Sequence, residues 1–347
     1  MKNIYVVGAG IFGCSIAIEL AKNNYNIILI EKNSDILSGA TKLNHNRIHF
    51  GYHYPRSIDT AKQSILGLSS FAMEYNDCII SDFENYYCIA KKNSNVSSLQ
   101  YENFCTSAGI DFQKTDINDD IINKDLISTI YKVNEPVYDI DILKAIIKNK
   151  LEKYSVEVKL NSPIESFNFN DNDQIINCTY SNLNRVNNHL GAELIPGKYQ
   201  DVLIPVISLE RTKIGLTVMD GPFCSLMPRG DNKNEFLVYH VLDSVLEESL
   251  SDFNATKKDV VKEASIILEN SKKYYPFLKD AKIIDYWRVK RFIPDSKETD
   301  SRVSQILVSK SNPNVISIFS GKVTTAVTIA KTVKNLIENG ELRNIYV

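Results

Sequence analysis

Three glycines near the start of the chain have the spacing of a nucleotide-binding turn. Residues 4–13 read Ile-Tyr-Val-Val-Gly-Ala-Gly-Ile-Phe-Gly, so Gly8, Gly10 and Gly13 follow an apolar run and precede a helix expected over about residues 11–22. In such a turn the first glycine permits a sharp change of direction and the second lets the backbone approach a pyrophosphate. The third allows the helix to pack closely on the strand. The amides at the start of the helix then face phosphate oxygens.

An acidic residue stands where the ribose of a dinucleotide would need it. Glu31 closes a second apolar run, residues 26–30, eighteen residues after Gly13. Its carboxylate can accept two hydrogen bonds from an adenosine ribose, and its charge would repel a 2′-phosphate. The pattern therefore predicts FAD or NAD and disfavours NADP. An ordinary strand-turn-helix without a ligand is the weaker alternative, and a signal peptide is rejected because the glycines interrupt its apolar core.

A histidine-rich segment follows the nucleotide motif. His45, His49 and His53 are three of the five histidines of the chain. On a helix their spacing would place three imidazoles on one face as a metal site. Gly51 and Pro55 oppose a helix, and in an extended chain the three side chains would spread over about 27 Å, too far to share an ion. We predict a loop laid along a bound ring and no metal.

Five segments resemble the D-amino acid oxidase (DAO) superfamily of FAD enzymes, and within it most closely the L-2-hydroxyglutarate dehydrogenase branch. They are residues 8–13 with Glu31, the turn 38–41, the stretch Ile48-His49-Phe50-Gly51-Tyr52, the strand and turn 174–181, and the last strand with its following turn, 316–326. The resemblance implies an α/β fold with a Rossmann-like FAD-binding domain of glutathione-reductase type and an interleaved antiparallel-sheet substrate domain of α+β character. Arg47, Tyr54, Tyr180 and the pair Lys322-Val323 depart from the family pattern.

The motif and the resemblance together imply a set of FAD contacts. They are Gly8, Gly10, Ile11, Phe12, Gly13, Glu31, Lys32, Ala40, Thr41, Arg47, Ile48, Val158, Cys178, Thr179, Gly321, Lys322, Val323, Thr324 and Thr325. At the C-terminal end, a β-rich run over 315–319 meets Gly321 and then a helix-like stretch, 325–337. The positive end of that helix would stabilise a reduced anionic flavin, and Lys322 could add a charge. A solvated loop lysine is the alternative for Lys322.

The remaining pattern indicates two interleaved domains. Apolar residues at helical spacing predict a helix over 136–153, and alternation predicts strands over 156–160, 86–92, 201–219 and 235–241. A charged surface helix is expected over 255–273. The FAD-binding domain is predicted to comprise residues 1–85, 136–190 and 285–347, and the substrate-binding domain residues 86–135 and 191–284.

The composition excludes several classes of protein. The chain has 347 residues, 44% hydrophobic and 24% charged, with a net charge of −2, so no global field recruits nucleic acid or an anionic membrane. No apolar run reaches the roughly 20 residues that span a bilayer. The cysteines (14, 78, 88, 105, 178 and 224) lack metal-like spacing and are typical of reduced thiols. We expect a cytoplasmic protein, monomeric or homodimeric.

A flavin would accept a hydride at N5 from a carbon that bears oxygen or nitrogen. An alcohol substrate also needs a base of near-neutral pKa, for which histidine is the natural side chain. His49 is the first candidate by resemblance, followed by His53 and His240, and a structural role is the alternative for each. The predicted substrate contacts are Tyr52, Tyr54, Arg56, Arg229 and Arg291. A small anionic substrate is favoured by the basic residues of the chain that flank apolar or aromatic runs, which are Arg56, Arg211, Arg229, Arg288, Lys290, Arg291 and Arg302.

Four functions remain open on sequence grounds. The first is FAD-dependent oxidation of a CH–OH carbon in a hydroxy acid, a sugar or a nucleotide-linked sugar. The second is FAD-dependent amine or amino acid oxidation, which needs no obligatory base. The third is an NAD dehydrogenase, and the fourth a non-catalytic flavin-binding protein. The sequence leaves the electron acceptor (oxygen, a quinone or another protein) undetermined, and His45 is a conceivable site of covalent flavin attachment.

Overall fold

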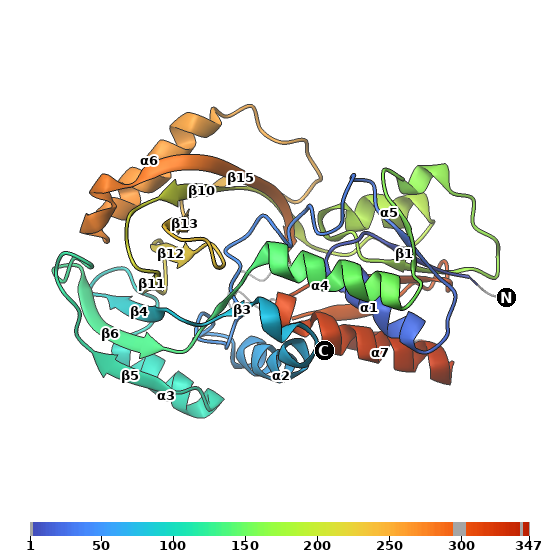
Figure 1. Ribbon diagram of the computed structural model, residues 1–347, viewed down its shortest axis with the longest axis horizontal. Coiled ribbons are helices and arrows are strands. Elements are labelled where there is room, and N and C mark those ends of the chain that lie inside the picture. Colours follow the sequence, from blue (N-terminus) through green and yellow to red (C-terminus); the bar gives the residue numbers. More distant parts are fainter. Residues whose placement is uncertain (1–2, 294–302, 341–342, 347) are drawn as a thin grey trace.

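The computed structural model describes residues 3–293, 303–340 and 343–346. Strands of these residues form two large sheets, which lie in separate halves of the molecule (Figure 1). The half on the right of Figure 1 contains the N-terminal strand β1 and helices α1 and α7. The half on the left contains the second sheet and helix α6.

The first sheet is mostly parallel and has the order β18-β16-β17-β9-β1-β2-β8. Its strands are β1 (Ile4–Val7), β2 (Ile27–Ile30), β8 (Glu157–Lys159), β9 (Gln174–Asn177), β16 (Gln305–Val308), β17 (Val315–Phe319) and β18 (Ile345–Tyr346). β1 pairs in parallel with β2 and β9, and β9 with β17, whereas β16 runs antiparallel to β17. Every residue of β2 is buried, as expected for a parallel strand whose faces are both covered.

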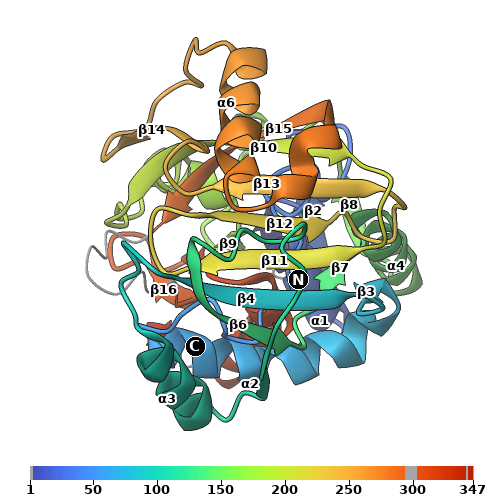
Figure 2. The ribbon, with the colours of Figure 1, turned by 90° about the vertical axis from the view of Figure 1, so that its left-hand side faces the viewer.

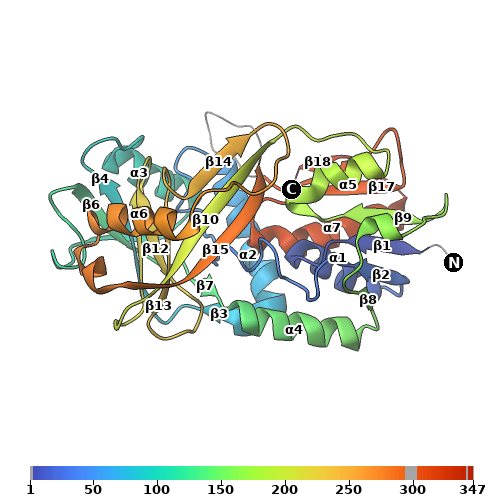
Figure 3. The same ribbon diagram turned by 90° about the horizontal axis from the view of Figure 1, so that it is seen from above.

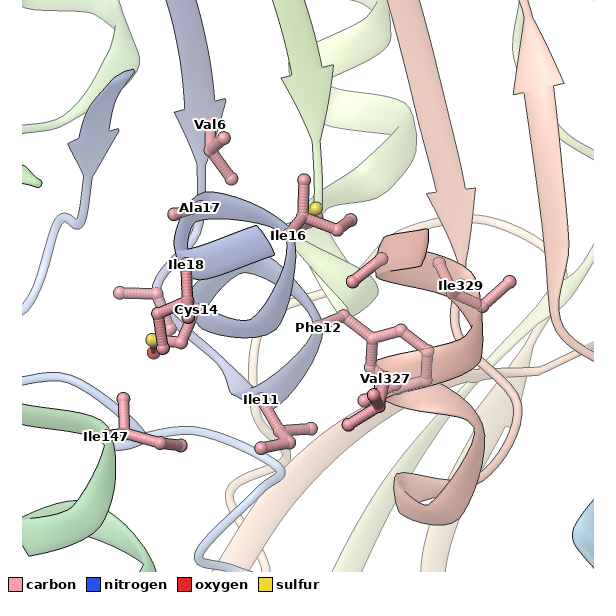
Figure 4. Packing of buried hydrophobic residues seen from close by; sticks show 14 of the residues in the cluster. Val6, Ile11, Phe12, Cys14, Ile16, Ala17, Ile18, Ile147, Val327 and Ile329 are labelled. Atoms are coloured by element: carbon pink, nitrogen blue, oxygen red, sulfur yellow. Dashed lines mark hydrogen bonds between the residues drawn. The ribbon is translucent and has the colours of Figure 1, made fainter. Parts of the chain in front are cut away.

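Helices cover both faces of the first sheet. They are α1 (Ile11–Lys22), α4 (Ile140–Lys153) and α7 (Ala326–Asn339) on one face and α5 (Leu183–His189) on the other. Figure 4 shows α1 packed between β1 and α7, with the Phe12 ring directed at Val327 and Ile329. The apolar side of α1 therefore fixes the position of the glycine turn that precedes it.

The second sheet carries the other half of the molecule, in the order β14-β10-β13-β12-β11-β4-β6-β5, with β15 along the free side of β10. Its strands are β4 (Glu84–Ala90), β5 (Phe112–Thr115), β6 (Ile127–Val133), β10 (Lys198–Ser208), β11 (Ile214–Met219), β12 (Cys224–Pro228), β13 (Glu235–His240), β14 (Val245–Ser249) and β15 (Lys282–Ile293). Figure 2 shows β13, β12, β11 and β4 stacked in this order, and Figure 3 shows β10 and β15 side by side.

The remaining elements connect or cover the sheets. Helix α6 (Val260–Lys272) covers the second sheet, α3 (Ser98–Ala108) packs near β4 and β6, and α2 (Ile58–Tyr75) contacts α7. A two-stranded ladder joins β3 (Ile79–Ile80) to β7 (Val137–Tyr138). Short 3₁₀ turns occupy Asn76–Cys78, Ile164–Ser166, Tyr180–Asn182, Pro276–Asp280 and Val323–Thr325. This is the α/β architecture predicted from the sequence, a mostly parallel sheet covered by helices beside a mostly antiparallel sheet.

Two details differ from the sequence prediction. β15 pairs with β10 along Lys198–Ser208, so it belongs to the second sheet although residues 285 onward were predicted in the FAD-binding segment. The antiparallel pairing extends along the whole of β10, although the two strands are far apart in the sequence. The helix predicted over 136–153 begins only at Ile140, because Asp139 caps it by accepting hydrogen bonds from the amides of Asp141 and Ile142.

Candidate active site

A single cavity of about 1090 Å³ runs between the two sheets. Gly8, Gly10 and Glu31 of the first sheet line one end of it. His49 and Arg291, from the histidine loop and β15, line the other. The cavity is therefore long enough to present a nucleotide motif at one end and titratable side chains at the other.

The glycine turn has the geometry expected of a dinucleotide-binding loop. Gly8 has a φ of +96°, in the region that favours glycine. A Cβ on Gly13 would lie 1.9 Å from the carbonyl oxygen of Gly8, so only glycine lets α1 pack against the turn. A Cβ on Gly10 would meet only the Thr41 hydroxyl, at 3.5 Å. The surface over Gly10 is therefore open to a phosphate, and the turn fits FAD.

Glu31 is held at the end of β2 by the glycine turn itself. Its side chain accepts hydrogen bonds from the amide of Ala9 at 2.8 Å and from the amide and side-chain nitrogen of Asn33 at 2.9 and 2.7 Å. The residue is 8% exposed and lines the cavity. These contacts orient the carboxylate, and its remaining lone pairs can accept from a ribose.

We expect Glu31→Ala to weaken FAD retention by about 1.5–3 kcal/mol for each charge-assisted hydrogen bond that is lost. The measurement is the flavin absorbance retained by the purified protein after gel filtration, together with the dissociation constant for FAD added to the apoprotein. Glu157→Ala is the matched control, because Glu157 is an exposed carboxylate on the neighbouring strand β8. Equal FAD retention by wild type and Glu31→Ala would remove this residue from the ribose site.

The cavity contains most of the predicted cofactor contacts. In addition to the turn, it is lined by Ile11, Phe12, Lys32, Ala40, Thr41, Arg47, Cys178, Thr179, Gly321, Lys322 and Val323. The predicted contacts outside its lining are Gly13, Ile48, Val158, Thr324 and Thr325. Gly13 supports the turn through packing, and Ile48 is fully buried in the core of the first half.

The histidine segment folds back on itself instead of extending. Gly51 has a φ of +100°, and a Cβ there would lie 2.9 Å from Cβ of Ala61 in α2. The ring centroids of His49 and His53 are 6.0 Å apart, so the wide spread of the three histidines calculated for an extended chain does not hold. Both imidazoles line the cavity, as does His45, whose Nδ1 lies 3.3 Å from the Ser225 hydroxyl.

A buried carboxylate that the sequence prediction missed lies directly behind His49. The Glu135 side chain is fully buried, and its Oε1 lies 3.4 Å from Nδ1 of His49. Its Oε2 accepts a hydrogen bond from Arg47 at 3.2 Å and another from the Tyr87 hydroxyl. Although burial raises it, contact with His49 and the charge of Arg47 bring the pKa of Glu135 below its usual value. In the sequence Glu135 stands directly before Pro136, and nothing in the local pattern of residues links it to His49.

The electrostatic environment keeps His49 neutral at physiological pH. Burial and the positive charge of Lys322 lower the pKa of His49 to about 4, although contact with Glu135 raises it. Burial and the charge of Arg47 also lower the pKa of Lys322, to about 7. The Lys322 ammonium lies 4.4 Å from the centre of the Tyr54 ring. A neutral imidazole can accept a proton, so His49 has the protonation state of a base.

The third histidine candidate lies away from the cavity. His240 ends β13 but is absent from the cavity lining, and its Nδ1 lies 2.9 Å from the carboxylate of Asp243. Because side chains alternate along a strand, its neighbour Tyr239 faces the cavity instead. We therefore do not retain His240 as a candidate base.

Three of the five predicted substrate contacts line the cavity and two do not. Tyr54, Arg56 and Arg291 line the cavity. Arg56 pairs with Asp220 at the cavity wall. Tyr52 is buried outside the lining, where its hydroxyl donates to the Asp111 carbonyl. Arg229 pairs with Glu235, and its guanidinium lies 5.2 Å from the centre of the Trp287 ring.

The other predicted basic residues are also accounted for. Arg288 and Lys290 line the cavity but pair with Asp201 and Asp252. The Arg211 guanidinium lies over the Phe277 ring, outside the lining. Arg302 lies outside the described residues.

Neither of two cavity cations has a carboxylate partner within the described residues. No carboxylate oxygen in this part of the chain lies within 4.0 Å of the Arg291 guanidinium or the Lys322 ammonium. Arg291 is instead 5.2 Å from the centre of the Tyr239 ring. Cations held by aromatic rings at a cavity are available to bind an anion.

None of the helices among the described residues is long and apolar enough to cross a membrane.

The sequence is similar to that of known FAD-dependent enzymes. Residues 3–115 match the family model DAO, described as FAD dependent oxidoreductase. The FAD-dependent monooxygenase kojA of Aspergillus flavus is 24% identical over 373 residues, which cover 96% of this chain and 85% of that protein.

Solved structures share the fold over nearly the whole chain. Glycine oxidase from Geobacillus kaustophilus superposes with a TM-score of 0.75 at 11% identity, covering 99% of this chain and 96% of that one. L-α-glycerophosphate oxidase from Mycoplasma pneumoniae, solved with FAD bound, gives a TM-score of 0.74 at 14% identity, with 100% and 97% coverage. Because the matched family model is described as FAD dependent oxidoreductase, the NAD-dependent and non-catalytic alternatives are set aside. The chain is a FAD-dependent oxidoreductase, and its residues 3–115 are similar to the DAO family.

Proposed function

We propose that the enzyme oxidises a CH–OH carbon of a small anionic substrate to a carbonyl. The substrate class is a hydroxy acid, as in the L-2-hydroxyglutarate branch that the His49 segment resembles, or a sugar or nucleotide-sugar derivative. Bound FAD supplies the hydride acceptor. The observation that carries the proposal is a neutral cavity imidazole backed by a buried carboxylate, His49 and Glu135, 3.4 Å apart.

His49 is the proposed base. Loss of a hydride from an alcohol leaves a carbonyl only if the hydroxyl proton is also removed. His49 lines the cavity, and its depressed pKa of about 4 keeps the imidazole unprotonated above that pH, the state that a base must have before it accepts a proton. An amine substrate would not require this arrangement, since its neutral form can lose a hydride directly.

The anion-binding role falls to Arg291 and Lys322. Both line the cavity, and the described part of the chain offers neither of them a carboxylate partner. A substrate carboxylate or phosphate would complete their charge balance, and the arginine fork can bind such a group through two hydrogen bonds. The glycerophosphate oxidase that shares this fold is named for a substrate that carries both a hydroxyl and an anionic group.

Amine oxidation is the second candidate, because glycine oxidase shares the fold over 99% of this chain. Anaerobic bleaching of the flavin absorbance separates the two functions. The panel contains L-2-hydroxyglutarate, L-lactate and glycerol 3-phosphate as hydroxy compounds, and glycine and L-proline as amines. We expect rapid bleaching by an anionic hydroxy compound and none by the amines. Bleaching by an amine alone would overturn the proposal.

A further inference from the structure

We propose that Glu135 is a positioning residue, which holds His49 as the Nδ1–H tautomer and stabilises the imidazolium formed when its Nε2 accepts the substrate proton. The catalytic part rests on the proposed function, whereas the tautomer is a property of the enzyme without substrate. Glu135 is not itself part of the cavity lining, so it can act on a substrate only through residues that are, and His49 is one of them.

The contacts of Glu135 leave it little freedom. Its side chain is 0% exposed. Oε2 is held by Arg47 at 3.2 Å and by the Tyr87 hydroxyl, and Oε1 accepts from the amide of Phe50 at 3.2 Å. The same Oε1 lies 3.4 Å from Nδ1 of His49, a buried nitrogen that makes no hydrogen bond in the structure. A carboxylate at Nδ1 favours the proton on that nitrogen, which leaves Nε2 as the accepting atom.

Arg47 keeps this carboxylate in place and cancels its charge. Its second guanidinium nitrogen donates to the Thr217 hydroxyl on β11 at 2.7 Å, so it links the histidine loop to the second sheet. The buried pair of Arg47 and Glu135 is neutral overall, which is the condition under which two such charges can be buried. A lone carboxylate at Nδ1 would favour a resting imidazolium, whereas this neutral pair lets His49 stay unprotonated.

Charged and titratable groups face His49 from several sides. Glu135 and Arg47 lie behind the ring, and the Lys322 charge acts from the turn after β17. The His53 and Tyr54 rings lie 6.0 and 5.7 Å from it, centroid to centroid. Among these groups, Glu135 alone is an anion at neutral pH. It is therefore the group that favours the protonated form of His49 during the reaction.

The proposed step balances in atoms and electrons. The substrate O–H bond breaks and its proton forms an N–H bond at Nε2 of His49. Bound FAD, which the glycine turn and Glu31 would hold, would accept the hydride with both electrons when the C–H bond breaks, and the carbon–oxygen bond would become a carbonyl. The imidazolium that results lies 3.4 Å from the Glu135 carboxylate and loses its proton to solvent after product release.

The direct test is ¹⁵N NMR of the FAD-loaded enzyme labelled at its five histidines. We expect His49, assigned by the signal lost in His49→Gln, to show a protonated Nδ1 and an unprotonated Nε2 between pH 6 and pH 8. Finding the proton on Nε2 in wild type would overturn the proposal without any further variant. In Glu135→Gln we expect the Nε2–H form to increase and the pKa of His49 to fall further.

Flavin reduction by the bleaching compound of the panel gives the second readout. Glu135→Gln should slow the reduction at least 10-fold at neutral pH and move the acid limb of the rate profile to lower pH, because the base is weaker. If Glu135→Gln loses FAD because Arg47 no longer has a carboxylate partner, the rate is measured instead on the double variant Arg47→Gln/Glu135→Gln, which removes both charges. Glu102→Gln is the matched control, since Glu102 also accepts from a tyrosine hydroxyl, that of Tyr131 at 2.7 Å, but lies outside the cavity lining.

The two proposals can fail separately. If only amines reduce the flavin and His49 still has its proton on Nδ1, the tautomer assignment stands and the proposed function is overturned. Reduction by a hydroxy acid, with the rate and acid limb of Glu135→Gln unchanged, would overturn the role of Glu135 alone.

Discussion

Replacing His49 with alanine is expected to leave FAD bound and to slow flavin reduction by about 10²–10⁴, the range for loss of a positioned general base. The substitution removes the imidazole that faces the cavity but none of the contacts of the glycine turn or of Glu31. Anaerobic stopped-flow absorbance with the bleaching compound of the panel measures the rate, and the visible spectrum measures FAD content. His189→Ala is the control, because His189 is exposed at the end of α5.

Two other outcomes would reassign His49. If His49→Ala loses FAD, the imidazole is a cofactor ligand, and the role of base passes to His53, whose ring centroid is 6.0 Å away in the same cavity. If the rate is unchanged, no base is needed at this position, and amine oxidation replaces the proposed reaction.

Gly13→Ala is expected to destabilise the fold by about 3 kcal/mol or more, the upper end of the cost of overpacking, and to abolish FAD binding. The new methyl group would lie 1.9 Å from the Gly8 carbonyl oxygen, a backbone atom that can move only if α1 separates from β1. The urea midpoint of the apoprotein and its capacity to bind added FAD are the measurements.

Gly39→Ala is the matched control for stability, because a Cβ on Gly39 meets no atom within 4 Å. Its apoprotein should unfold at the wild-type urea concentration. A Gly13→Ala protein as stable as this control would show that the turn can relax at little cost, and that glycine is not required there by packing.

The elements with strong local signals were predictable. The helix α1 begins and ends where the glycine motif and the apolar spacing place it, and β17 spans the predicted β-rich run, Val315–Phe319. Both depend on residues close in the sequence. The fold class followed from the family resemblance, which this motif and four further segments carry.

The contacts between distant segments were not predictable. Glu135 meets Arg47 across 88 residues, and nothing in the local pattern of either residue indicates the other. The approach of His49 and His53 depends on the backbone of Gly51, which turns because Ala61 of α2 packs against it. The β15 assignment failed for the same reason, since its partner β10 lies far away in the sequence.

The sheet order also has a consequence for how the chain matures on the ribosome. β9 lies between β1 and β17, and β17 with the turn at Gly321 and Lys322 comes from the last tenth of the chain. A nascent chain emerges from its N-terminus, so β1, α1 and Glu31 must wait until β17 has been synthesised before this sheet can close. Pairing between such distant segments is slow. Flavin capture is therefore expected only after β17 has emerged, and the unpaired edge of β9 is the surface that chaperones would protect until then.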